Sequence, residues 1–149
     1  SSPSLDSART RVFVEIQQTA EFHLNQVVDL LKPHGISPAQ YNVLRILRGA
    51  EPAGLPCSEI GHRMISRDPD ITRLLDRLEK RELAARGRQG GDRRVITVRI
   101  TATGLALLAA LDEPVQQLHR QQFAGLAEEQ LTQLIGLLQQ TRQDQFTKI

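Results

Sequence analysis

Apolar residues recur at helical spacing along most of this chain, and the period changes from helical to alternating only after Leu83. Apolar and polar residues then alternate over residues 96–100, which is typical of a strand with one buried face. Together with a short strand expected near 85–88, this predicts a β-hairpin whose tip is residues 89–93. The chain is therefore expected to have an α+β fold, mostly α, with one hairpin inserted among helices.

Residues that begin and end helices divide the helical part. The first helix is expected to end near Leu31, where the sequence Lys-Pro-His-Gly follows. Ser37 is placed to cap a second helix that has proline at its first position, and Thr101 is placed to cap the fifth. A short third helix is expected at 58–64 and a last one at 128–146.

The fourth helix is the best defined of the set. Asp68 is expected to cap it, Pro69 to take its first position, and Asp70 to complement the positive end of the helix dipole. One face is apolar, formed by Ile71, Leu74, Leu75 and Leu78. The opposite face is polar, formed by Thr72, Arg73, Asp76, Arg77 and Lys80. A short helix, a turn, this helix and a basic hairpin follow one another in the order of a winged helix-turn-helix.

Positive charge is concentrated in this middle part of the chain. Residues 63–99 carry a net charge of +5, whereas the whole chain carries +2 and the remainder is therefore acidic. Such a distribution predicts a surface for an anionic partner.

Double-stranded DNA is the partner that this arrangement favours. Arg73 and Arg77 lie one helical turn apart, so both can enter one major groove and bond guanine. The two glycines of the hairpin tip allow a close approach, Arg93 or Arg94 would enter the minor groove, and Asp92 would orient one of them. The predicted DNA-binding residues are Arg67, Pro69, Asp70, Thr72, Arg73, Arg77, Arg88, Asp92, Arg93 and Arg94.

The sequence resembles the MarR family of bacterial transcriptional regulators. The resemblance spans residues 10–147 and is carried by four stretches: SPAQYNVLRIL at 37–47, DITRLLDRLE at 70–79, DRRVITVRIT at 92–101 and TGLALL at 103–108. The aspartate and second arginine of the family's wing motif fall on Asp92 and Arg94. Many members begin the recognition helix with Ser-Thr, where this chain has Pro69 and Asp70.

The resemblance implies a cytoplasmic homodimer joined by its first and last helices and bound to a pseudo-palindromic operator. It implies one domain over 1–149, with a winged-helix DNA-binding lobe at about 37–101 and a helical dimerisation region at about 8–32 and 102–147. Such proteins usually repress transcription, and many release DNA when a small phenolic or other amphipathic effector binds.

The same resemblance places an effector cleft where the dimerisation helices meet the DNA-binding lobe. His23, Tyr41 and Arg45 are candidate polar contacts there, with Arg45 suited to a carboxylate. Two structural alternatives stay open. His23 can be a packing residue beside an apolar helix face, and Tyr41 and Arg45, four residues apart, can simply pack together.

Other classes of function are weaker. The four histidines are scattered and Cys57 is the only cysteine, so neither a metal site nor a disulfide is predicted. Cys57, near a helix start, could sense oxidants, although single cysteines are more often inert packing residues. No catalytic constellation, cofactor site or membrane span is expected. The remaining alternative is a non-specific DNA-binding protein or a helical adaptor whose basic face docks an acidic partner.

Overall fold

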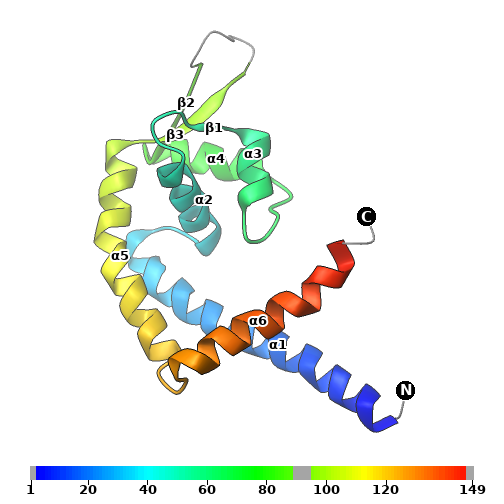
Figure 1. Cartoon of the computed structure of the whole chain (residues 1–149). Coiled ribbons are helices and arrows are strands. Elements are labelled where there is room, and N and C mark those ends of the chain that lie inside the picture. Colours follow the sequence, from blue (N-terminus) through cyan, green and yellow to red (C-terminus); the bar gives the residue numbers. More distant parts are fainter. Residues whose placement is uncertain (1–2, 89–94, 147–149) are drawn as a thin grey trace. The chain divides into compact units, whose positions relative to one another are not determined.

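The computed structural model describes residues 3–88 and 95–146. The chain divides into two compact units, Ser1–Val115 and Gln116–Ile149. Helices predominate, and three short strands interrupt them (Figure 1). In chain order the elements are α1 (Pro3–Leu31), η1 (Lys32–His34), α2 (Pro38–Gly49), β1 (Leu55–Pro56), α3 (Cys57–Arg63), α4 (Ile71–Lys80), β2 (Ala84–Gly87), β3 (Thr97–Ile100), α5 (Ala102–Gln122) and α6 (Glu128–Phe146).

The strands form one antiparallel sheet in the order β1-β3-β2. β2 and β3 are the two arms of the predicted hairpin, with Ala84 opposite Ile100 and Gly87 opposite Thr97. The mostly helical α+β prediction is thus confirmed, and each arm lies within one residue of its expected bounds. β1 was not predicted, because its two residues lie in a Gly- and Pro-rich segment that indicated only the end of α2.

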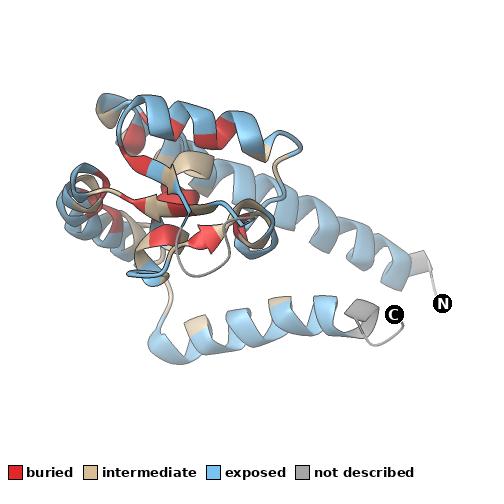
Figure 2. Cartoon of the chain, turned by 90° about the horizontal axis from the view of Figure 1, so that it is seen from above, coloured by how far each residue is buried: buried red, intermediate tan, exposed pale blue. Residues whose placement is uncertain are grey.

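The core lies in the first unit, where α2, α4, the sheet and the early turns of α5 contribute buried aliphatic side chains (Figure 2). The fully buried large residues are Leu31, Leu44, Leu47, Ile60, Leu75, Leu78, Leu108, Leu111, Val43 and Val98. The inward face of α2 consists of Tyr41, Val43, Leu44 and Leu47, and the half-buried Ile46 packs beside them. Burial of each leucine side chain contributes about 1.5–3 kcal/mol, so each of these residues contributes substantially to the stability of the fold.

The first residues of α5 pack closely on the segment that precedes β2. Thr101 caps the helix, since its Oγ1 accepts from Gly104 N at 3.0 Å and donates to the carbonyl of Glu82 at 2.6 Å. This confirms the predicted cap. Gly104 is buried, and a Cβ at this position would lie 2.3 Å from the carbonyl oxygen of Leu83. Only glycine therefore allows α5 to approach this segment so closely.

Most of α1 does not contribute to the core of the first unit. Every residue from 4 to 22 is exposed, and only the last turns contribute Val27, Leu30 and Leu31 to the core. Large apolar side chains lie among the exposed ones, including Val12, Phe13, Ile16 and Phe22. A long helix with such a surface is typical of a subunit interface.

The second unit contains the end of α5, a turn and α6. The side chain of Gln130 accepts from the backbone N–H of Ala127 at 2.8 Å, just before the first residue of α6. The predicted bounds of the last helix are confirmed, and Leu134, Ile135 and Leu137 are exposed along it. In the described part of the chain, none of the helices combines the length and the apolar character that a membrane crossing requires.

Candidate nucleic-acid interface

Helix α4, which carries several of the predicted DNA-binding residues, begins two residues later than predicted. Asp70, not Asp68, is its N-cap, because Asp70 Oδ1 accepts from the backbone N–H of Arg73 at 3.1 Å. Asp68 Oδ1 instead accepts from the backbone N–H of Asp70 at 2.8 Å. This local bond closes a turn around Pro69, which lies before the helix rather than at its first position. Pro69 and Asp70 are both exposed at the start of α4.

Replacing Asp70 with alanine is expected to lower the free energy of unfolding by about 1 kcal/mol, because the N-cap bond is lost. Urea denaturation at one fixed protein concentration measures the difference. Asp70→Asn is the matched control, since its amide oxygen retains the acceptor and should preserve most of the stability. Equal losses in the two variants would contradict the capping role.

α4 divides into three longitudinal stripes. Leu74, Leu75 and Leu78 are buried and hold the helix on the core. A second stripe of polar residues faces strand β2 and consists of Thr72, Asp76 and Glu79. The third stripe lies about 100° further round the helix and is basic: Arg73, Arg77 and Lys80, all exposed.

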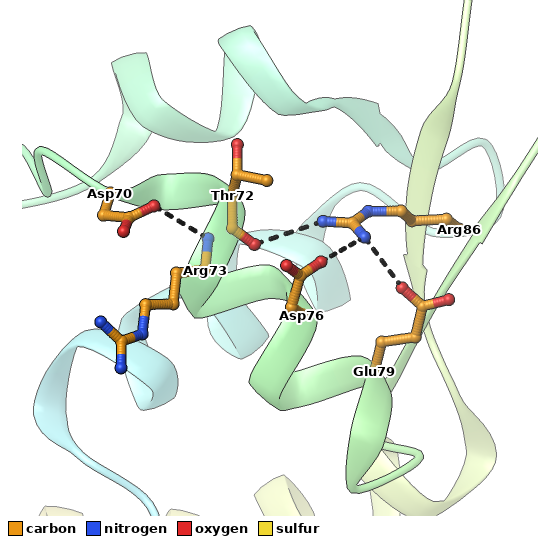
Figure 3. Close-up of polar contacts among 6 residues, drawn as sticks. All are labelled: Asp70, Thr72, Arg73, Asp76, Glu79 and Arg86. Carbon is orange, nitrogen blue, oxygen red and sulfur yellow. Dashed lines mark hydrogen bonds and ion pairs between the residues drawn. The ribbon is translucent and has the colours of Figure 1, made fainter.

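Arg86, on β2, joins the polar stripe to the sheet. Its Nη1 donates to Asp76 Oδ1 at 2.5 Å and to Glu79 Oε2 at 3.2 Å, and its Nη2 donates to the backbone carbonyl of Thr72 at 3.3 Å (Figure 3). The hydrogen bond to Asp76 raises the pKa of Arg86, partial burial opposes this, and the charges of Asp76 and Glu79 add to the rise. Arg86 was not among the predicted site residues, because only its contacts in the folded structure show that it faces α4.

The basic stripe, by contrast, has no partner within the described part of the chain. Among the described residues, the guanidinium groups of Arg73 and Arg77 take part in no hydrogen bond or ion pair. In Figure 3 the Arg73 side chain extends from α4 away from Arg86. Both arginines line a polar hollow shared with Asp68 and Asp70 and with Ser37 at the start of α2. Two unpaired arginines one turn apart are suited to bidentate contacts with an anionic or base-edge acceptor.

Further predicted DNA-binding residues flank this stripe. Arg67 lies exposed in the segment before α4, and Thr72 is exposed in its first turn. Arg88 is exposed directly after β2. Asp92, Arg93, Arg94 and the whole predicted hairpin tip lie outside the described residues.

The segment between α3 and α4 is tied to α2. Asn42 Oδ1 accepts from the backbone N–H of Ile65 at 2.8 Å, while the Ile65 side chain is 89% exposed.

α3 begins at Cys57 after Pro56, without a side-chain cap, so it starts one residue before the predicted 58–64. Cys57 is half-buried at this helix start.

Two of the three candidate effector residues, Tyr41 and Arg45, contact each other. The guanidinium of Arg45 lies over the ring of buried Tyr41, with 5.9 Å between its Cζ atom and the ring centroid. His23 lies on α1, where its Nδ1 is 3.4 Å from Gln26 Oε1 and its ring meets Phe22 edge-on. Tyr41 and Arg45 therefore pack against each other, as the structural alternative for this pair predicted.

A separate, mainly apolar cavity of about 410 Å³ lies between α1, the start of α2 and the segment after α3. None of the three candidate effector residues lines it. Its apolar wall is formed by Leu24, Val28, Pro38, Ala39, Met64 and Ile65. Within residues 3–88 and 95–146, no three His, Cys, Asp or Glu side chains gather as metal ligands would.

Comparison with known proteins places this geometry in a family. A family model described as the MarR family matches residues 34–95. The structure of a MarR transcription factor from Planctomyces limnophilus is 37% identical and covers 87% of this chain and 94% of that one, with a TM-score of 0.68. A mutant of Escherichia coli MarR in complex with operator DNA is 25% identical over 88% of this chain and 93% of that one, with a TM-score of 0.79. The homoprotocatechuate degradative operon repressor of Escherichia coli is 25% identical over 85% of this chain and 84% of its own length.

Proposed function

This chain belongs to the MarR family of transcriptional regulators, and we propose that it is a homodimeric repressor that reads a pseudo-palindromic operator and is released by a small-molecule ligand. The observation that carries this proposal is the basic stripe of α4. Arg73 and Arg77 are exposed, adjacent and without partners among the described residues, on a helix held by its leucines. A helix of this kind, following a short helix and a turn, presents its free side chains to the major groove.

The proposed contacts follow the division of α4. Arg73 and Arg77 would reach base edges from the basic stripe. Thr72 meets Arg86 through its backbone carbonyl, so its exposed side chain would also be available to a base edge. Arg67 and Arg88 on either side would contact phosphates. Pro69 and Asp70 at the start of the helix would influence which bases are accepted, since Asp70 can only accept a hydrogen bond. Asp92, Arg93 and Arg94 remain part of the proposal as residues that approach the minor groove.

Homodimerisation would use the first and last helices. α1 and α6 each expose several large apolar side chains. Contact with a second copy of the chain would remove this apolar surface from water, as is common in homodimers. We therefore retain residues 37–101 as the DNA-binding lobe and 8–32 with 102–147 as the dimerisation region of one domain. A regulator of this kind would act in the cytoplasm, where bacterial DNA lies, and without catalysis.

An amphipathic effector would be accommodated by an apolar wall with a few polar groups. The cavity lined by Leu24, Val28 and Met64 has that character and lies beside the segment that leads into α4. His23, Tyr41 and Arg45 do not line this cavity and stay a separate prediction for the polar contacts of a phenolic effector.

Selection from a random duplex library, read by sequencing, tests the function directly. We expect a two-fold symmetric motif whose half-sites lie about 10 base pairs apart, because two recognition helices would occupy successive major grooves. The mass of the protein in solution should correspond to two chains. Salt-sensitive binding without any motif would contradict the proposal and favour a non-specific DNA-binding protein or an adaptor for an acidic partner.

A further inference from the structure

We propose that Arg86 is a positioning residue for DNA recognition, which acts by holding α4 against strand β2 and touches no DNA itself. The inference rests on the DNA-binding function proposed above. It assigns a role to the contacts of Arg86 with Asp76 and Glu79, two residues that lie beside the basic stripe.

The contacts of Arg86 span almost the whole of α4. The carbonyl of Thr72 lies in the first turn, Asp76 in the middle and Glu79 in the last turn. The leucine stripe fixes α4 on one side only. A rigid guanidinium that binds three positions on a second side resists rotation of the helix about its own axis. Because Arg73 and Arg77 project from the third side, that rotation would change the direction in which they enter a groove.

The same contacts remove an electrostatic conflict. Asp76 and Glu79 place two carboxylates next to the stripe that would approach DNA, where they would repel phosphate if unpaired. Arg86 pairs with both, and with a side chain only 30% exposed it is partly shielded from solvent. Networks of this type are more effective than isolated surface ion pairs.

Arg86 is poorly suited to a direct contact with DNA. Both of its terminal nitrogens already donate to α4. Arg88, two residues further along the chain, is exposed and has no partner among the described residues. Arg88 is therefore the better candidate for a phosphate contact and a suitable comparison.

A double-mutant cycle separates the two roles. Arg86→Ala, Asp76→Ala and their combination would be titrated with the duplex obtained by selection and with a scrambled duplex, at several salt concentrations. We expect each single variant, and the double variant equally, to lose about tenfold in affinity for the selected duplex. Affinity for the scrambled duplex should change less than about twofold and the salt dependence should keep its slope, because no phosphate contact is lost.

Two control variants sharpen the test. Arg88→Ala should weaken binding to both duplexes alike and reduce the salt slope by about one. Arg86→Lys keeps the charge but lacks the planar fork, so it should remain impaired on the selected duplex. Full recovery with lysine, additive losses in the double variant, or an Asp76→Ala variant that binds normally would each overturn the positioning role.

The unsubstituted protein provides the last control. Urea unfolding of each variant shows whether it is still folded at the temperature of the binding experiment. If the unsubstituted protein itself shows no preference for the selected duplex, the proposed function fails and the positioning role fails with it. If it shows that preference while Asp76→Ala has no effect, only the positioning role is contradicted.

Discussion

Replacing Arg73 and Arg77 together with alanine is expected to lower the affinity for the selected operator by about 2–6 kcal/mol, since each bidentate contact to a base contributes about 1–3 kcal/mol. The two side chains share one face of α4 and have no internal partners among the described residues, so their removal should leave the fold intact. Fluorescence anisotropy with labelled duplexes measures the loss. Affinity for a scrambled duplex should fall much less, because non-specific binding depends on phosphate contacts alone.

A variant with the same change in net charge is the appropriate control. Arg9→Ala combined with Arg11→Ala removes two positive charges from the exposed start of α1, far along the chain from α4. Because both positions lie in the proposed dimerisation region, the mass of this variant in solution is first checked to be that of two chains. We expect a small, equal loss on both duplexes from this pair, caused by weaker long-range attraction. If the Arg73 and Arg77 variant loses equally on both duplexes as well, these arginines do not read bases.

Replacing Gly104 with alanine is expected to lower the free energy of unfolding by about 2 kcal/mol, through overpacking. The new Cβ would lie 2.3 Å from the carbonyl oxygen of Leu83 and 2.7 Å from Ile100 Cγ1. That carbonyl cannot easily move, because it accepts from the backbone N–H of Thr101 at 3.1 Å. α5 would have to shift away from the sheet, and the loss would exceed the roughly 1 kcal/mol that alanine gains over glycine in a helix.

Gly61→Ala in α3 is the control for this effect. A Cβ at Gly61 has no neighbouring atom within 4 Å, so only the gain in helix propensity applies and stability should stay equal or rise. Both variants would be unfolded in urea at the same protein concentration, because the stability of a dimer depends on concentration. A stable Gly104→Ala protein would contradict the close packing at the start of α5.

Local signals predicted much of this fold. Ser37 caps α2, as its place before Pro38 indicated, and in the structure it also forms a capping box with Gln40. Thr101 caps α5 through its hydroxyl. The alternation over 96–100 predicted the strand that became the middle of the sheet. Each of these signals operates within a few residues, where side-chain chemistry alone selects the backbone conformation.

The features that could not be predicted from the sequence depend on contacts between segments far apart in the chain. β1 is a strand only because Leu55 lies opposite Val98, more than forty residues later. The importance of Arg86 depends on Asp76 and Glu79, which a separate element presents to it. Prediction was also limited between neighbouring residues at the start of α4. Asp68 and Asp70 both suit the cap position of a helix, and only the observed hydrogen bonds show that Asp70 is the cap and Asp68 belongs to the turn before it.

The division of α4 into stripes also has a consequence for how such a regulator can diverge. Residues 74, 75 and 78 serve the core, 72, 76 and 79 meet the sheet, and 73, 77 and 80 face outward. Substitutions at 73 and 77 can therefore accumulate without weakening either attachment of the helix. After gene duplication, two copies could acquire separate operators through a few changes on one side of a ten-residue helix, while each inherits the same scaffold.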